Sequence, residues 1–177
     1  MLPEASRPAS LRLDRRQTPV GEALIVTDET GALRAFDFAD YEPRMLRLMA
    51  RHYPGQAIVA GVAPKAVSVA VDAYFDGDLD ALSGLDWKTN GTEFQRRVWA
   101  GLCTIPAGVT LSYQGLALQV GSPKAMRAVG LANGSNPVAV VVPCHRVIGA
   151  SGRLTGYGGG LERKAWLLRH EGAAFTA

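Results

Sequence analysis

The chain has 177 residues, of which 47% are hydrophobic and 20% charged, so it has enough apolar side chains for packed cores. Its two cysteines and three histidines show no C-x-x-C or H-x-x-x-H spacing, which excludes a disulfide framework and a structural zinc signature. Residues 1–91 carry 10 basic and 13 acidic side chains, whereas residues 92–177 carry 9 and 3. The basic half suits a polyanionic partner such as nucleic acid, with an ordinary solvated surface as the alternative.

Membrane insertion and secretion are not expected from this sequence. No stretch approaches the roughly 20 consecutive apolar residues that a bilayer-spanning helix needs. The start of the chain, MLPEASRPASLRLDRR, lacks the apolar segment of a signal peptide. We therefore expect a soluble, cytoplasmic protein without a membrane partner.

The N-terminal half predicts a small antiparallel sheet. Apolar and polar residues alternate over residues 10–38, with turn signals at 19–21 and 29–31, which indicates a three-stranded meander. Helical patterns follow over residues 41–53 and 64–78. A turn-rich stretch then leads to the basic half, and we predict one domain over residues 1–88 and a second over residues 91–177.

The second half predicts three successive helices. The first, over residues 92–105, begins with Thr92 as a cap, and the second covers residues 112–120. The third covers residues 123–133, with Pro123 in its first position. Two short helices joined by a tight glycine-containing turn outline a helix-turn-helix, although most short helix pairs bind no DNA.

A cysteine and a histidine follow the apolar run VAVVV (residues 138–142), which predicts a buried strand ending at Pro143. Cys144 becomes a nucleophile if a base such as His145 favours its thiolate. Neighbours on an extended strand point to opposite faces, so the two need a turn or a bridging water. Glu162 and Glu171 are both candidates to orient the imidazole, and each can equally be a surface carboxylate.

Cys103 differs from Cys144 in its setting. It lies on the first predicted helix of the basic half, between Leu102 and Ile105 along the chain. A free cysteine in such a position is usually a small buried hydrophobe. We expect Cys103 to be buried and inert.

These residues carry a resemblance to a known family. PCHRV (143–147), RAVG (127–130) and NP (136–137) stand in the order found in the O6-alkylguanine-DNA alkyltransferases, also called methylated-DNA–protein-cysteine methyltransferases. The similarity covers about residues 91–172. The N-terminal half agrees more loosely, through TPVG (18–21) and NGTEFQRRVW (90–99).

The resemblance assigns chemical roles. It implies that Cys144 accepts the alkyl group, that His145 takes the thiol proton through a water, and that Glu171 polarises His145. It makes Asn136 a hinge that ties the recognition helix to the active-site loop. Tyr113 becomes the phenol that donates toward the guanine oxygen or the departing ring.

It also assigns binding roles. Arg127 resembles the arginine finger that enters the DNA stack when the target nucleotide flips out. The small residues Ala125, Ala128 and Gly130 permit close approach to the minor groove. The substrate pocket is expected to use backbone groups of Cys144 and Val147 and the loop formed by Tyr157, Gly158, Gly159 and Gly160. Arg146 is expected to form an ion pair beneath the active-site loop.

The overall expectation is a monomeric two-domain α/β (α+β) protein. It combines an N-terminal RNase H-like domain with a helical, winged-helix-like C-terminal domain. It is expected to repair double-stranded DNA containing O6-alkylguanine, with O4-alkylthymine as a second expected substrate, by irreversible single-turnover transfer without cofactor or metal. The N-terminal half lacks the cysteines and histidines of the family's zinc-site members. The alternatives are an alkylated-DNA-binding module or regulator without turnover, and a cysteine hydrolase or redox enzyme.

Overall fold

The computed structural model describes residues 7–176 of the chain. Helices and strands divide between two compact units, whose described parts are residues 7–91 and 92–176. Both units mix helices with a small sheet, so the predicted α/β class is confirmed. Within residues 7–176 no helix is long and apolar enough to cross a membrane.

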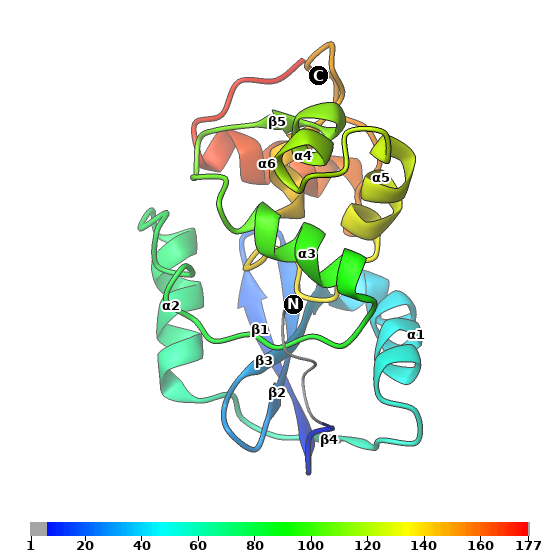
Figure 1. Ribbon diagram of the computed structural model, residues 1–177. Helices are drawn as coiled ribbons and strands as arrows, with labels where there is room; N and C mark the ends of the chain where they lie inside the picture. Colours follow the sequence, from blue (N-terminus) through cyan, green and yellow to red (C-terminus); the bar gives the residue numbers. More distant parts are fainter. Residues whose placement is uncertain (1–6, 177) are drawn as a thin grey trace. The chain divides into compact units, whose positions relative to one another are not determined.

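A four-stranded sheet forms the centre of the N-terminal unit (Figure 1). Its strands are β1 (Leu11–Thr18), β2 (Gly21–Asp28), β3 (Leu33–Phe38) and β4 (Ile58–Ala60), in the order β3-β2-β1-β4. The predicted antiparallel meander of β1 to β3 is confirmed. The fourth strand, β4, pairs parallel to β1 and was not predicted, because three residues are too few to show alternation.

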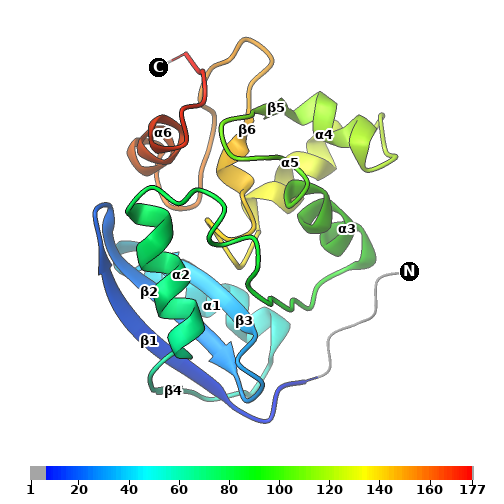
Figure 2. The ribbon, with the colours of Figure 1, turned by 90° about the vertical axis from the view of Figure 1, so that its left-hand side faces the viewer.

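Helices α1 (Glu42–His52) and α2 (Lys65–Phe75) lie on either side of this sheet (Figures 1 and 2). Met45 and Met49 of α1 pack with Leu24 and Val26 of β2 in a buried cluster. Leu24 and Val26 are two residues apart and so share one face of the strand, and Met45 and Met49 are four apart and so share one face of the helix. The sheet therefore buries alternate residues of β2 against α1.

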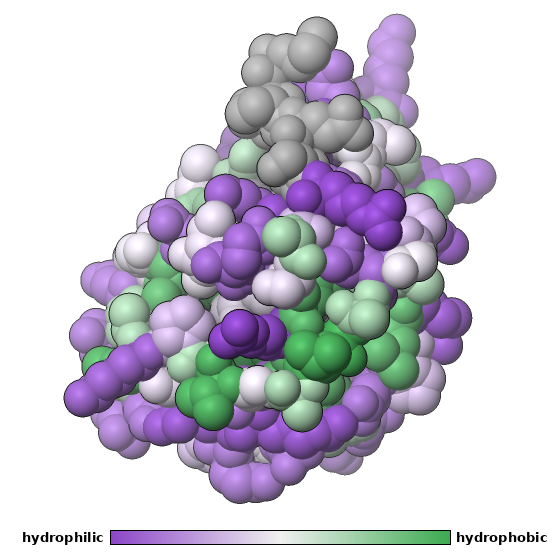
Figure 3. Space-filling model, turned by 90° about the horizontal axis from the view of Figure 1, so that it is seen from below, coloured by the Kyte–Doolittle hydropathy of each residue, from purple (hydrophilic) through white to green (hydrophobic). Residues whose placement is uncertain are grey.

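The surface of the molecule is mainly polar in the view of Figure 3, where hydrophobic residues form a small group among hydrophilic ones. The exposed hydrophobic residues of the N-terminal unit include Val59 and Val62, of which Val62 is 80% exposed. Small exposed apolar groups of this kind are common on folded proteins, and we assign this one no function.

Four helices build the C-terminal unit: α3 (Glu93–Leu102), α4 (Tyr113–Gln119), α5 (Met126–Gly134) and α6 (Leu161–His170). The predicted Thr92 cap is confirmed, because its hydroxyl accepts from the Gln95 amide while the Gln95 side chain accepts from the Thr92 amide. The Trp99 indole N–H donates to Ala132 O at 2.8 Å and so fastens α3 to α5. Strands β5 (Leu111–Ser112) and β6 (Val147–Ile148) pair in parallel.

The prediction that Pro123 is the first residue of the third helix is wrong. Helix α5 begins at Met126, with Ala125 as its N-cap. The Ala125 amide donates to Ser122 O at 2.9 Å, which closes a turn over Pro123 and Lys124. Proline is favoured in the second position of such a turn, so it shapes the link between α4 and α5 and does not begin the helix.

The predicted buried strand over residues 138–142 is also wrong, although every residue of this segment is buried. The chain bends at Val140, whose φ is +68°, and the Val141 amide donates to Ala139 O at 2.8 Å. This is a tight three-residue turn that a β-branched side chain rarely adopts. The apolar run thus reports burial, and its conformation is set by contacts from elsewhere in the unit.

Candidate active site around Cys144

Cys144 and His145 lie in a single turn of 3-10 helix, η2 (Cys144–Arg146), directly before β6. The turn is closed by the Arg146 amide, which donates to Pro143 O at 3.0 Å. Cys144 is 5% exposed and His145 is fully buried. On an extended strand the side chains of Cys144 and His145 would point to opposite faces. The backbone forms a turn at these two residues, so that restriction does not apply.

Glu171 holds the imidazole of His145. The distance from His145 Nε2 to Glu171 Oε1 is 2.8 Å, and both side chains are completely buried. An ionised carboxylate only accepts, so Nε2 carries the proton in this contact. The other ring nitrogen, Nδ1, is buried without a hydrogen-bond partner among the described residues. Burial, together with the positive charges of Arg146 and Lys164, lowers the pKa of His145 despite the opposing contact with Glu171, which favours the neutral imidazole.

Arg146 provides the second anchor of this carboxylate. Its Nε and Nη2 donate to Glu171 Oε2 and Oε1, each at 2.9 Å, and its Nη1 donates to Ile105 O at 2.5 Å. Burial alone would raise the pKa of Glu171, but the hydrogen bonds from His145 and Arg146 and the positive charge of Arg146 hold that pKa well below its usual range. The ion pair expected of Arg146 is present. Glu162, the other candidate acid, lies exposed in the first turn of α6.

Two asparagines connect α5 with the segment that carries Cys144. The fully buried Asn136 donates through Nδ2 to Val142 O at 2.7 Å and accepts from the Val138 amide at 3.0 Å. Asn133 Nδ2 donates to Cys144 O at 3.4 Å. Side-chain amides thus give the bent segment the hydrogen bonds that a neighbouring strand would otherwise supply.

A buried lysine that the sequence analysis did not select lies close to Cys144. Lys164 has no solvent exposure, and its Nζ donates to Val147 O at 2.6 Å and to Thr155 O at 3.2 Å. Burial lowers its pKa to about 8, and the nearby Cys144 opposes this shift. A lysine in the helical pattern ERKAWLL resembles a surface residue, so the sequence contained no signal of its burial.

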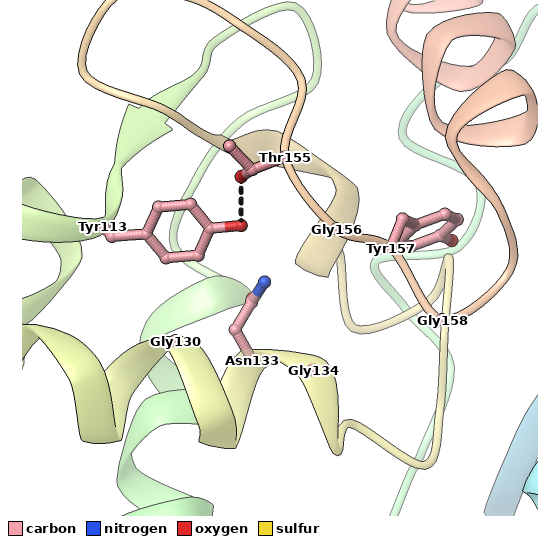
Figure 4. Close-up of a pocket in the computed structure, with 8 residues that line it drawn as sticks. All are labelled: Tyr113, Gly130, Asn133, Gly134, Thr155, Gly156, Tyr157 and Gly158. Atoms are coloured by element: carbon pink, nitrogen blue, oxygen red, sulfur yellow. Dashed lines mark hydrogen bonds between the residues drawn. The ribbon is translucent and has the colours of Figure 1, made fainter.

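A cavity of about 490 Å³ opens between α4, α5 and the loop that precedes α6 (Figure 4). It is lined by Tyr113, Gly130, Asn133, Gly134, Thr155, Gly156, Tyr157 and Gly158. Four of these eight residues are glycines, and the other four carry a hydroxyl or amide group, which leaves room for a flat ring near polar groups. Cys144 does not itself line the cavity; Asn133 bonds to its carbonyl and lines the cavity wall.

The structure brings some of the predicted pocket residues to this cavity and leaves others outside it. Tyr113, Gly130, Tyr157 and Gly158 line it. Val147 and Gly159 do not: the carbonyl of Val147 is bonded to Lys164, and that of Gly159 accepts from Arg163. Sequence reasoning missed Asn133, Gly134, Thr155 and Gly156, although they neighbour selected residues in the chain.

The outer face of α5 presents one cation among small and apolar side chains. Arg127 and Ala128 are exposed, and Leu131 is 72% exposed one turn further along. On the inner face, Val129 is fully buried. Gly130 faces Tyr113, since a Cβ built on it would lie 3.7 Å from that ring. The helix can therefore contact a partner through Arg127 while its other side forms the cavity wall.

Cys103 was expected to be buried, and this is wrong. It is exposed as the C-cap of α3, which ends at Leu102. Within residues 7–176 no group of three or more histidine, cysteine, aspartate or glutamate side chains could hold a metal ion.

The fold and site define a class of protein that combines a buried group of Cys144, His145 and Glu171 with a pair of short helices, α4 and α5. Comparison with known proteins identifies the family. Residues 93–173 match the family described as 6-O-methylguanine DNA methyltransferase, DNA binding domain. The methylated-DNA–protein-cysteine methyltransferase of Shigella flexneri is 48% identical over 157 residues, which are 88% of this chain and 92% of the relative.

Solved structures agree. The O6-methylguanine methyltransferase of Mycobacterium tuberculosis is 41% identical, with a TM-score of 0.75 over 92% of this chain and 93% of that one. A structure from the same organism in complex with DNA has a TM-score of 0.76 at 39% identity and covers 93% of each chain. The chain belongs to the methylated-DNA–protein-cysteine methyltransferase family.

Proposed function

We propose that the protein repairs double-stranded DNA by transferring the alkyl group of O6-alkylguanine to Cys144. Membership of the family supports alkyl transfer and DNA as the partner. The assignment of Cys144 depends on one observation: His145, its neighbour in the same turn, makes a buried contact of 2.8 Å with Glu171. A neutral imidazole fixed by a carboxylate through Nε2 leaves Nδ1 to act as a base.

The proposed step is a direct displacement. His145 Nδ1 takes the proton of the Cys144 thiol through a bridging water, and the sulfur attacks the alkyl carbon in line with the departing oxygen. The new S–C bond forms as the bond from that carbon to guanine O6 breaks. Tyr113 donates toward the departing guanine, which is a poor leaving group unless its developing charge is stabilised.

Transfer inside a duplex requires the base to leave the stack. An alkylated O6 within the helix is out of reach of a buried thiol, and flipping costs a few kcal/mol. We place Arg127 of α5 in the vacated position, with Ala128 facing the minor groove. Ala125 and Gly130, also proposed as minor-groove contacts, are only partly exposed. The cavity beside Tyr113 and Tyr157 would hold the flipped guanine.

A thioether has no easy route back to a thiol, so we propose one transfer per molecule, without cofactor. Action on O4-alkylthymine, a monomeric state and a cytoplasmic location stay predictions. We also retain as proposals the roles of Val147 and Gly159 in the substrate pocket and the division into domains at residues 88–91.

The test is transfer of label from DNA. Duplex DNA containing O6-[methyl-labelled]guanine is incubated with the protein, and the tryptic peptide containing Cys144 is analysed. The expected result is one label per molecule on that peptide and guanine in the DNA product. DNA binding without label would favour a lesion-binding module or regulator. Multiple turnovers on a small ester or peroxide would favour a cysteine hydrolase or redox enzyme.

A further inference from the structure

Two hydroxyl groups meet across the cavity. Thr155 Oγ1 donates to the phenol oxygen of Tyr113 at 2.8 Å (Figure 4). Tyr113 is the first residue of α4, and Thr155 lies 42 residues further on, in the loop between β6 and α6. Both residues line the cavity. The contact therefore joins two walls of the pocket that are remote in sequence.

The backbone of Thr155 is held by a hydrogen bond from a buried lysine. Its carbonyl accepts a hydrogen bond of 3.2 Å from Lys164, whose Nζ also donates to Val147 O at 2.6 Å. Lys164 is fully buried on α6, so it ties the cavity loop to the segment that follows Cys144. The neighbouring lining residues Gly156 and Gly158 have no side chain that could replace the threonine hydroxyl.

The direction of this hydrogen bond matters for proton donation. A phenol has one proton and accepts through its oxygen. When Thr155 donates to the Tyr113 oxygen, the phenolic proton is left to point at another acceptor. If Tyr113 then donates to a departing guanine, negative charge develops on its oxygen, and a donor already aimed at that oxygen stabilises this charge.

We propose that Thr155 is a positioning residue for alkyl transfer. It orients the phenol of Tyr113 so that its proton faces the bound guanine, and it stabilises the phenol oxygen as that proton is shared. The inference rests on the proposed function, because it concerns the departure of guanine from the alkyl group. Thr155 itself does not contact the reacting sulfur or carbon in this scheme.

The test is a double-mutant cycle with Tyr113. Thr155→Val removes the hydroxyl and keeps the shape, Thr155→Ser keeps the hydroxyl, and Tyr113→Phe removes the phenol oxygen. The rate constant of transfer is measured with excess protein over O6-methylguanine duplex. Loss of one oriented donor predicts about a tenfold slower transfer for Thr155→Val and less than about a threefold change for Thr155→Ser.

In the Tyr113→Phe background, Thr155→Val is expected to cause no further loss, because its target oxygen is gone. The reaction of iodoacetamide with Cys144 and the melting temperature are measured for every variant. Both are expected to match the wild type for Thr155→Val, since this exposed side chain does not contact the thiol. A merely structural role of Thr155 would instead change them.

Three results would count against the inference. Thr155→Val reacting within a factor of about two of the wild type would overturn it, as would equal losses from Thr155→Val in both backgrounds. If Thr155→Val fails to fold, Thr155→Ala replaces it, with the same expected tenfold loss. Absence of transfer by the wild type would overturn the proposed function together with the inference. The first two results, in contrast, require an active wild type and would overturn the role of Thr155 alone.

Discussion

His145 Nε2 lies 2.8 Å from Glu171 Oε1, and neither side chain is exposed to solvent. The two residues are 26 positions apart, one in the turn η2 and the other at the C-terminus of α6. Their contact fixes the tautomer of the imidazole and turns Nδ1 into the free basic position. The same carboxylate neutralises Arg146, so it supports both the proposed base and the folded structure.

Glu171→Gln should destabilise the protein and slow transfer. The substitution leaves Arg146 as a buried cation without its counter-charge, which costs about 3–5 kcal/mol, and it weakens the hold on His145. The low pKa of Glu171 means that its stabilising effect is present above the ordinary value of 4.5 and is lost as pH falls through the folded-state pKa. Urea unfolding should show a wild-type advantage that shrinks as the pH is lowered from about 7 to about 3. An advantage independent of pH would contradict the assignment.

Lys164→Met should alter how stability changes at alkaline pH. Folding lowers the pKa of Lys164 from 10.5 to about 8, so between these values the unfolded chain binds more protons than the folded one. Wild-type stability should therefore rise relative to Lys164→Met as pH increases from 8 to 10.5, by up to about 3 kcal/mol. Unfolding free energies at pH values across this window provide the measurement. Lys124→Met, which removes an exposed lysine, is the control and should show no such difference.

Cys144→Ala should abolish alkyl transfer while DNA binding persists, because the substitution removes only the buried thiol and leaves Arg127 and Ala128 exposed on the outer face of α5. Label incorporation and binding to an O6-methylguanine duplex are measured on the same preparation. Cys103→Ser is the matched control: this cysteine is exposed and outside the site, so transfer should equal that of the wild type. Label retained in Cys144→Ala and lost in Cys103→Ser would reverse the assignment of the acceptor.

Arg127→Ala should weaken repair of duplex DNA far more than reaction with free benzylguanine. The exposed guanidinium is proposed to fill the gap that the flipped base leaves in the DNA stack. Free benzylguanine is not part of a stack, so its reaction does not require this replacement. Rates on the two substrates are compared for the variant and the wild type, and we expect a loss of at least about tenfold on the duplex alone. Equal losses on both substrates would mean that Arg127 acts on the site itself.

Asn136→Ala should lower the unfolding free energy by about 2–3 kcal/mol, because it leaves the buried Val138 amide unpaired and the buried Val142 carbonyl with only its bond from the Cys144 amide. Transfer should fall with it, since these bonds hold the segment before Cys144. Chemical denaturation at neutral pH measures the change. Asn90→Ala removes one side-chain bond, to His52 O in the N-terminal unit, and should cost about 1 kcal/mol without affecting transfer. A loss for Asn136→Ala no larger than this control would contradict the hinge role.

Patterns confined to a few neighbouring residues were enough to predict much of this protein. Alternation predicted the meander, and Thr92 predicted the start of α3, because both signals depend on contacts within one strand pair or one helical turn. The order of RAVG, NP and PCHRV carried the family, since these motifs are continuous in the chain. Cys144 and His145 could be selected for the same reason.

Contacts between remote residues decided the rest. The run at 138–142 is buried as its composition indicates, but hydrophobicity records burial and not backbone shape, and Asn136 supplies bonds that allow a bend at Val140. The burial of Lys164 and its bonds to two separate segments had no sequence signal. By itself the sequence determined which local elements and reactive groups are present. Only the tertiary structure decided which of them meet, because hydrogen bonds such as that between Thr155 and Tyr113 form between residues that packing, not chain proximity, brings together.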